Sequence, residues 1–344
     1  MNPVLVEVLR GAQVESAHTG ALAVLDADGA VVAALGDIDR PVFPRSAVKL
    51  LQALPLVESG AADRLGLGDD ALALACASHA GEPAHARAVA ATLAHAGLDA
   101  DALECGAHWP YHEPSARALA AAGARPSALH NNCSGKHAGF LCLACELAHA
   151  SGAEPRAFAR GYVRAEHPVM REVTAALGAV AGCDLAHAPR GTDGCSIPTY
   201  AIPLRALALG FARVATGHGV APARAQAMRR LRAAVAARPF MVGGSTRFDT
   251  RVMQRLGERA CVKAGAEGMH CAALPGRGLG VAIKIDDGQG RAAEVAMAAV
   301  LQALLRPEGD DAAWLRGLAE PRLVNWNGIE VGALRTGAAL RGLT

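Results

Sequence analysis

The segment 130–139, with the sequence HNNCSGKHAG, concentrates side chains that can do chemistry. Cys133, Lys136 and His137 lie within one short stretch, and the apolar run 140–145 that follows predicts a buried helix. Loops that lead into a packed helix are a common way of fixing a functional site on a rigid element. The two asparagines and Ser134 also suit a helix cap, but a cap does not require Cys133, Lys136 and His137 together.

A metal site is one chemistry that this segment could support. Cys133 and Cys195, the latter in a polar segment that begins at Asp193, would supply two thiolates, and Lys136 or His137 a nitrogen. Zinc accepts sulfur and nitrogen donors in a tetrahedral arrangement, and a metal ion can remove the proton of a lysine ligand. The alternative is a cysteine hydrolase with Cys133 as nucleophile and His137 as base, although adjacent turns of one segment rarely present two such side chains correctly.

A second candidate site is the pair Ser46 and Lys49, at the start of a predicted helix that ends or kinks at Pro55. Residues three apart lie on one helix face, so the amine can reach the hydroxyl. A serine needs an adjacent base, and a neutral lysine suffices. Arg45 could hold a substrate carboxylate or help keep Lys49 unprotonated. The alternative interpretation is a helix-capping serine beside a solvated lysine.

A further serine, Ser78, lies between an apolar, strand-like run (71–77) and a predicted helix. It is either a second functional hydroxyl or a helix cap.

Lysine is scarce in this chain, because only four of its 34 basic residues are lysine: Lys49, Lys136, Lys263 and Lys284. Arginine stays protonated at any ordinary pH, whereas a lysine amine can be desolvated and used as a base or a ligand. Three of the four lysines lie in candidate motifs. Lys263 ends a short apolar segment and precedes Ala-Gly, which departs from the Lys-Thr-Gly of serine acyltransferases.

The composition excludes several classes of protein. A chain of 344 residues with 52% hydrophobic residues can bury a large core, and a net charge of +2 gives no reason to expect nucleic acid or an anionic membrane as partner. Nine cysteines scattered through Ala/Leu-rich segments are not a disulfide framework. The N-terminus lacks the pattern of a signal peptide, and no apolar run reaches the length of a membrane span. We therefore expect a cytoplasmic protein.

The predicted strands cluster at the two ends of the chain. Strands are expected at 3–10, at 21–35 as a hairpin with Asp28-Gly29 as its turn, and at 279–285. Helices are expected at 84–96, 115–122, 138–150, 155–165, 169–180, 221–237 and 291–305. This order predicts a mixed α/β fold with one sheet from about 1–60 and 255–340 and a helix-rich middle at about 80–250.

Taken together, these motifs resemble the rhizobial-type (class 3) L-asparaginases from about residue 5 to residue 335. The resemblance is carried by Ser46-x-x-Lys49, Ser78-His79, the block 130–139, Asp193-Gly-Cys195-Ser, Gly-x-x-Arg247-Phe-Asp249 and Lys263-Ala-Gly-Ala-Glu-Gly268. It implies a fold similar to serine β-lactamases and glutaminases, formed by a single catalytic domain, 1–344, that acts as a homodimer. The implied activity is hydrolysis of L-asparagine to L-aspartate and ammonia.

The resemblance also implies a role for each candidate residue. Ser46 would be the nucleophile with Lys49 as its base, and Ser78 would pair with Lys263. A zinc ion would be held by Cys133, Lys136 and Cys195. The residues expected to contact the substrate are Arg45, His137 and Asp193.

Three other functions fit part of this pattern. A penicillin-binding or β-lactamase enzyme shares Ser-x-x-Lys but has no use for the cysteines, and a glutaminase would differ only in its substrate. A zinc-stabilised binding protein would leave the placement of the lysines unexplained.

Overall fold

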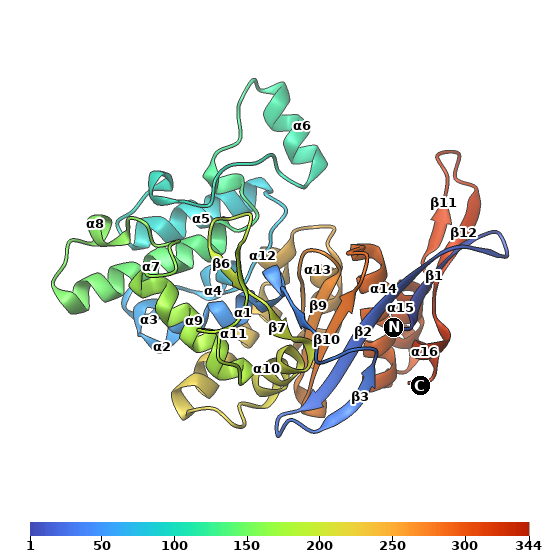
Figure 1. Ribbon diagram of the computed structural model, residues 1–344. Helices are drawn as coiled ribbons and strands as arrows, with labels where there is room; N and C mark the ends of the chain where they lie inside the picture. Colours follow the sequence, from blue (N-terminus) through green and yellow to red (C-terminus); the bar gives the residue numbers. More distant parts are fainter. Residues whose placement is uncertain (344) are drawn as a thin grey trace. The chain divides into compact units, whose positions relative to one another are not determined.

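The computed structural model describes residues 1–343, which form two compact units (Figure 1). Unit 1 comprises residues 1–47, 201–216 and 262 onward, and unit 2 comprises residues 48–200 and 217–261. No helix among the described residues is long and apolar enough to cross a membrane. The single-domain interpretation of the sequence stays a prediction.

Unit 1 contains an antiparallel sheet in the order β11-β12-β1-β2-β10-β9-β8, with β3 paired to β2. Its strands are β1 (Val4–Arg10), β2 (Gln13–Asp26), β3 (Val31–Leu35), β8 (Cys261–Ala264), β9 (Met269–Leu274), β10 (Leu279–Ile285), β11 (Arg322–Val324) and β12 (Glu330–Thr336). A short pair, β4 (Pro41–Val42) and β7 (Ile202–Pro203), lies apart from it. The prediction of a sheet built from both chain ends is confirmed, as are the strands at 3–10 and 279–285 and the hairpin at 21–35.

Helices cover this sheet, since every residue of β9 is buried. The helices of unit 1 are α10 (Leu204–Thr216), α14 (Gly290–Leu305), α15 (Gly309–Ala319) and α16 (Ala338–Arg341). Helix α10 packs on β2, β9 and β10, and it approaches so closely that a Cβ at Gly280 would lie 2.0 Å from the carbonyl oxygen of Ala208. Glycine at this position is therefore what allows α10 to lie on the sheet.

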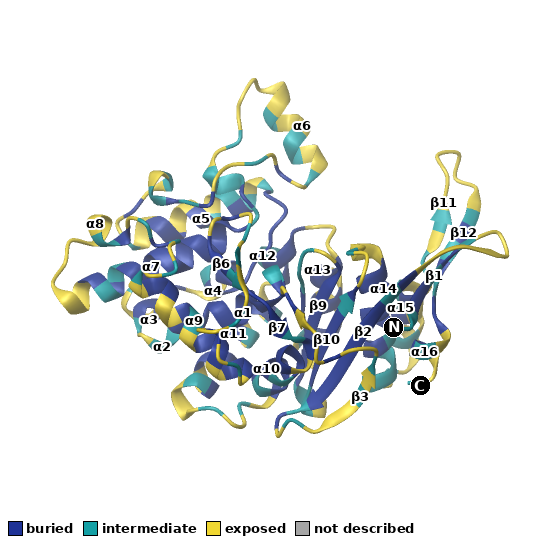
Figure 2. Cartoon of the chain, in the orientation of Figure 1, coloured by how far each residue is buried: buried dark blue, intermediate teal, exposed yellow. Residues whose placement is uncertain are grey.

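Unit 2 is helical apart from the short hairpin of β5 (Arg190–Thr192) and β6 (Pro198–Tyr200). Its helices are α1 (Lys49–Gln52), α2 (Leu54–Glu58), α3 (Ala61–Arg64), α4 (Asp69–Ala75), α5 (Pro83–His95), α6 (Glu113–Ala121), α7 (Ser134–Ser151), α8 (Pro155–Ala159), α9 (Pro168–Ala181), α11 (Pro222–Ala237), α12 (Pro239–Gly243) and α13 (Phe248–Leu256). Helix α7 is buried along most of its length, whereas α6 has no buried residue (Figure 2). The predicted helical middle is confirmed.

Several predicted elements were wrong in detail. The run 71–77 is not a strand but falls largely in α4, because its alanines and leucines favour a helix. The helix expected from Ser46 to Pro55 begins as a 3-10 turn, 45–48, and Pro55 lies in the first turn of the next helix, where proline needs no hydrogen-bond partner. The helix expected over 155–165 ends at Ala159.

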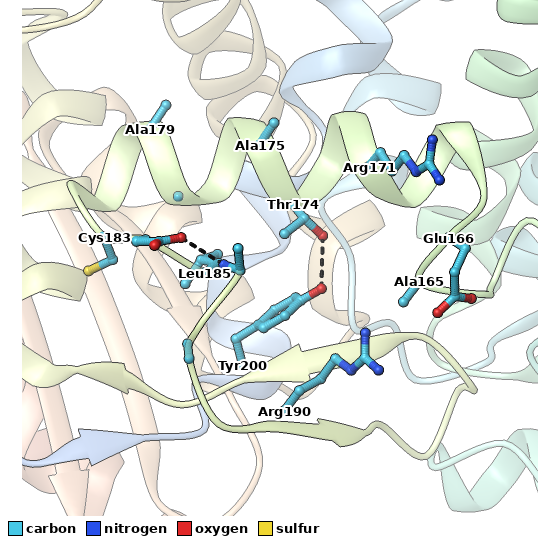
Figure 3. A pocket seen from close by; sticks show the side chains of 14 residues that line it. Ala165, Glu166, Arg171, Thr174, Ala175, Ala179, Cys183, Leu185, Arg190 and Tyr200 are labelled. Atoms are coloured by element: carbon cyan, nitrogen blue, oxygen red, sulfur yellow. Dashed lines mark hydrogen bonds between the residues drawn. The ribbon is translucent and has the colours of Figure 1, made fainter.

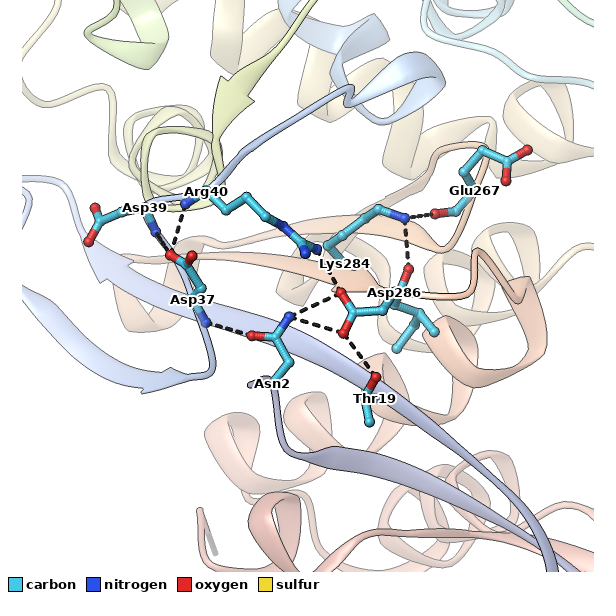
Figure 4. Close-up of polar contacts among 9 residues, drawn as sticks. Asn2, Thr19, Asp37, Asp39, Arg40, Glu267, Lys284 and Asp286 are labelled. Carbon is cyan, nitrogen blue, oxygen red and sulfur yellow. Dashed lines mark hydrogen bonds and ion pairs between the residues drawn. The ribbon is translucent and has the colours of Figure 1, made fainter.

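A polar cluster in unit 1 fixes the loop that leads to Ser46 (Figure 4). The Asp286 carboxylate accepts hydrogen bonds from Asn2 Nδ2 at 3.0 and 3.1 Å, from Thr19 Oγ1 at 2.9 Å and from the Arg40 guanidinium at 2.6 Å. Asn2 Oδ1 in turn accepts the backbone N–H of Asp37. Burial alone would raise the pKa of Asp286, but the hydrogen bonds outweigh it and lower this pKa. The charged carboxylate therefore stabilises the loop 37–40.

Replacing this carboxylate with an amide tests the contribution of the cluster. We expect Asp286→Asn to lower the free energy of unfolding at pH 7 by roughly 1–3 kcal/mol, since charge-assisted bonds are lost. Because the folded pKa is lowered, the stabilisation is present above the unfolded pKa of about 3.9 and disappears as pH falls through the folded pKa. Urea unfolding between pH 3 and 7 measures it.

The matched control is Asp39→Asn in the same loop, where the carboxylate pairs with Arg205 but is 68% exposed. An exposed pair contributes little, so this variant should unfold like the wild type. Equal losses of stability in the two variants would contradict the role given to Asp286.

Candidate active site

The predicted nucleophile Ser46 lies in a strained turn of unit 1. Arg45, immediately before it, has a φ of 50°, a left-handed conformation that non-glycine residues rarely adopt. The turn packs on the chain just after β8, where a Cβ at Gly265 would lie 2.5 Å from the carbonyl oxygen of Pro44. Ser46 and the buried Lys263 thus belong to neighbouring segments of unit 1. Backbone strain of this kind is frequent at functional sites.

Lys49 is the first residue of α1 and is 1% exposed. Its Nζ donates to the carbonyl oxygen of Ala77 at 2.6 Å and to Cys133 Sγ at 3.1 Å. Burial lowers the pKa of Lys49 and the nearby Lys136 charge adds to this, while Cys133 opposes both. An amine whose pKa is lowered in this way is suited to act as a general base.

The segment 130–139 contributes Cys133 and Lys136 to a buried cluster in unit 2, which Lys49 and Cys195 complete. Lys136 Nζ lies 3.0 Å from Cys195 Sγ, and the thiol groups of Cys195 and Cys133 are hydrogen-bonded. With the bond from Lys49 to Cys133, the four side chains form one chain of contacts. The structure thus brings together the three predicted zinc ligands, Cys133, Lys136 and Cys195. Their role as ligands stays a prediction.

The charges in this cluster stabilise one another. The hydrogen bond from Cys195 and then the two lysine charges lower the pKa of Cys133 well below its usual value, although burial opposes this. Burial alone would lower the pKa of Lys136, but the neighbouring sulfurs of Cys195 and Cys133 raise it. Of the two thiols, Cys133 is therefore the more readily ionised, and the amine that donates to its sulfur is that of Lys49.

Asn131 holds the start of α7 in place, a larger role than the helix cap that its sequence position indicates. Its Nδ2 donates to the carbonyl oxygens of Cys105, at 2.8 Å, and Gly106, at 3.1 Å. Its Oδ1 accepts the backbone N–H of Cys133 at 2.8 Å. A buried amide with both ends satisfied fixes the position of Cys133 relative to the loop at 105–106.

Ser78 follows α4 in unit 2, and its backbone N–H donates to Val242. His79, next to it, is fully buried and stacks on His85 with the ring centroids 4.8 Å apart. His79 Nδ1 accepts the N–H of Gly81, so Nε2 carries the proton and donates to Ser134 Oγ at 3.0 Å. Burial lowers the pKa of His79, so the ring is neutral and holds the turn that carries Ser78.

The two predicted substrate-binding residues of unit 2 lie near the cluster. His137 follows Lys136 on α7 and is fully buried. Asp193 precedes the hairpin turn that ends in Cys195 and Ser196, and its carboxylate acts electrostatically on Lys136. Ser196 has a φ of 75°, a second strained non-glycine residue beside a candidate ligand.

The predicted residues are divided between the units. Arg45, Ser46 and Lys263 belong to unit 1; Lys49, Ser78, Cys133, Lys136, His137, Asp193 and Cys195 belong to unit 2. The pairings of Ser46 with Lys49 and of Ser78 with Lys263 therefore stay predictions, as does the idea that Arg45 helps to keep Lys49 unprotonated.

Sequence reasoning missed the residues that orient this site, above all Asn131, Tyr162 and Glu104. Tyr162 donates to or accepts from His137 Nδ1 at 2.7 Å and accepts the N–H of Glu104 at 3.0 Å. A lone tyrosine and a lone glutamate in helical surroundings carry no local signal, because their partners lie far away in the chain. Only the doubled asparagine before Cys133 could have drawn attention to Asn131.

A surface hollow of about 770 Å³ lies in unit 2 between α9 and the chain around β5 and β6 (Figure 3). Arg171, Arg190 and Glu166 line it, and Tyr200 Oη meets Thr174 Oγ1 at 3.2 Å. None of the predicted site residues is among its lining residues, so we assign it no part in catalysis.

The side-chain hydrogen bonds of Asn131 predict how an isosteric substitution changes the stability of the protein. Asn131→Asp replaces the donor that faces two carbonyl oxygens with another oxygen, so we expect a loss of about 2–4 kcal/mol in the free energy of unfolding. Urea unfolding measures this loss. The control is Asn325→Asp, because Asn325 Oδ1 only accepts, from the N–H groups of Asn327 and Ile329, as a carboxylate also can. Similar losses in both variants would refute the bridging role of Asn131.

None of the curated proteins matches this chain. Solved structures with some similarity include Mglu in its native form (17% identity, 90% of this chain and 70% of that one, TM-score 0.36) and Mglu in its tris and glutamate form (17%, 90% and 65%, TM-score 0.36). Another is a β-lactamase from Mycobacterium bovis (17%, 82% and 93%, TM-score 0.33).

The family comparison covers nearly the whole chain. The model of the L-asparaginase II family matches residues 6–336, a range that contains every predicted site residue. Among the described residues, no three of the His, Cys, Asp and Glu side chains form a group that could hold a metal ion, and the predicted zinc ligands include a lysine in place of a third such residue. The chain belongs to the L-asparaginase II family, which makes it an asparaginase-type amidohydrolase.

Proposed function

We propose that this protein hydrolyses L-asparagine to L-aspartate and ammonia, with Ser46 as the nucleophile and Lys49 as its base. The observation that carries the proposal is the state of Lys49, a fully buried amine three residues after a serine, with a pKa lowered mainly by burial. The family match supports an amide as substrate. The reaction follows the general scheme of serine acyl transfer.

In the first step the Lys49 amine takes the proton of the Ser46 hydroxyl while Oγ attacks the side-chain amide carbon of asparagine. The C–N bond then breaks, and the proton passes from Lys49 to the leaving nitrogen, which departs as ammonia. In the second step Lys49 takes a proton from water, the hydroxide attacks the ester carbon, and Ser46 recovers its proton as aspartate leaves. Ser78 and Lys263 assist these transfers, and backbone N–H groups at the start of the Ser46 turn stabilise the oxyanion.

Cys133, Lys136 and Cys195 are suited to hold a zinc ion. The donor set supports this, because two sulfurs and an amine already lie in contact in a buried place, and the lowered pKa of Cys133 favours the thiolate form that zinc binds. A metal would have to displace the proton of Lys136, whose pKa is raised. When bound, zinc would supply a positive charge that attracts the α-carboxylate or α-amino group of the substrate. Arg45, His137 and Asp193 would complete the recognition of these groups.

The proposal includes a homodimer in the cytoplasm. None of the nine cysteines forms a disulfide bond, which suits a reducing compartment.

Removing the nucleophile is the central test. We expect Ser46→Ala to lower ammonia release from L-asparagine by about 10⁴-fold or more, because loss of the nucleophile removes the acyl-enzyme route. Ser151→Ala is the matched control, since its hydroxyl only bonds the carbonyl oxygens of Leu147 and Ala148 at the end of α7. Activity of Ser46→Ala within tenfold of the wild type would reject the serine mechanism. Parallel assays on L-glutamine and a fluorescent penicillin distinguish the glutaminase and penicillin-binding alternatives.

Metal content tests the zinc proposal separately. We expect protein purified without added zinc to contain about one zinc per chain, measured by elemental mass spectrometry, and Cys133→Ala to lose it because a ligand is removed. Cys142→Ala is the control, since this thiol lies on α7, which begins just after Cys133, and bonds the carbonyl oxygen of Thr92, with burial raising its pKa to about 12. Full zinc occupancy in Cys133→Ala would exclude Cys133 as a ligand.

A further inference from the structure

The ring of His137 is oriented by a hydrogen bond whose direction can be deduced. His137 Nδ1 lies 2.7 Å from the hydroxyl oxygen of Tyr162, and both side chains are 0% exposed. The same oxygen accepts the backbone N–H of Glu104 at 3.0 Å. A backbone N–H can only donate, so one lone pair of the tyrosine oxygen is already used. The hydroxyl proton is then free to be donated to His137 Nδ1.

This arrangement places the proton of the neutral imidazole on Nε2. In the opposite tautomer Nδ1–H would donate to Tyr162, leaving both the tyrosine hydroxyl proton and the Nε2 lone pair without a partner. The tautomer with the proton on Nε2 leaves only one group unpaired, the Nε2–H of His137. Because each unpaired buried polar group is costly, this tautomer is favoured.

The Nε2 atom of His137 has no hydrogen-bond partner within residues 1–343. Buried donors in folded proteins are nearly always paired, so a fully buried one that the chain does not satisfy indicates an acceptor that comes from outside it. The ring of His137 lies 5.7 Å from that of Phe140, centroid to centroid, and Lys136 Nζ lies 5.5 Å from the centroid of the same Phe140 ring, which places His137 beside the cluster of cysteines and lysines. An acceptor there must be an oxygen or another atom with a lone pair.

Tyr162 is itself held firmly in place. Glu104 contacts this turn twice, through its N–H to the tyrosine hydroxyl and through Oε1, which accepts the N–H of Gly161 at 2.7 Å. Gly161 has a φ of 72°, so the tight turn before Tyr162 suits a glycine. The tyrosine hydroxyl therefore has little freedom to move away from His137.

We propose that Tyr162 is a positioning residue that fixes His137 as an Nε2–H donor to a carboxylate or carboxamide oxygen of the bound amino-acid amide. The identity of that acceptor rests on the proposed function; the tautomer and the role of Tyr162 do not. Tyr162 acts through His137 and itself touches no substrate.

The tautomer is measured without any assay of activity. Nitrogen-15 NMR of wild-type protein labelled at histidine distinguishes protonated from unprotonated ring nitrogens, and His137→Gln assigns the signal. We expect Nε2 of His137 to be protonated and Nδ1 unprotonated, with the Nε2–H resonance moving when L-aspartate is added. A protonated Nδ1 would overturn the proposal. A protein that shows the expected tautomer but hydrolyses no asparagine would refute the proposed function alone.

The role of Tyr162 is tested by removing its hydroxyl. Tyr162→Phe should lower kcat/KM for L-asparagine about 10- to 100-fold, mainly through a higher KM, and should let a proton appear on His137 Nδ1. Tyr200→Phe is the control, since it removes a hydroxyl of the same unit that meets only Thr174 at 3.2 Å, and it should leave both readouts unchanged. A kcat/KM within twofold of the wild type, or an unchanged tautomer, in Tyr162→Phe would overturn the proposal.

If Tyr162→Phe does not fold, variants of His137 test whether its Nε2–H donor has a function. His137→Gln keeps an N–H donor and should retain at least tenfold more activity than His137→Ala, when both melt within a few degrees of the wild type. Equal activities would show that the donor has no function.

Discussion

The site depends on the burial of two lysine amines beside two cysteine sulfurs. Moving an ammonium group out of water is costly, and the cost is offset only where partners of opposite charge or good hydrogen-bond acceptors surround it. Lys49 has a carbonyl oxygen and Cys133, and Lys136 has Cys195. The two sulfurs are hydrogen-bonded to each other as well, so removing either cysteine would leave a buried lysine amine without its sulfur partner.

The apolar surroundings make this cluster chemically useful. Cys133 and Cys195 are part of a hydrophobic core with Phe140, Tyr162 and Ile197, so water is largely excluded. Burial lowers the pKa of the Lys49 amine, whereas the neighbouring sulfurs of Cys195 and Cys133 raise the pKa of the Lys136 amine. Two lysines thus acquire different properties from their environments alone, which is how proteins obtain a base and a cation from the same residue type.

The parts of the sequence with clear periodicity or turn signals were predicted well. The hairpin around Gly29, the strand 279–285 and the helix after Lys136 all follow from local patterns. The run 71–77 was misread because short apolar stretches fit a strand or a buried helix equally, and its alanines and leucines decided for the helix. Helix α10 was not recognised, because only its packing on the sheet around Gly280 distinguishes it from the helical middle.

The sequence by itself determined the reactive residues, their local spacing and the family, because these depend on residue types within short segments. It indicated Lys49, Lys136, Cys133 and Cys195, and the resemblance implied that the last three lie together, but nothing in it indicated that Lys49 contacts Cys133. Tertiary structure decided the contacts, since Lys49 and Cys133 lie 84 residues apart and Lys136 and Cys195 59 apart. It also decided which amine loses its proton more easily and which nitrogen of His137 is protonated. Those properties arise from desolvation and from partners distant in the chain, which no local pattern records.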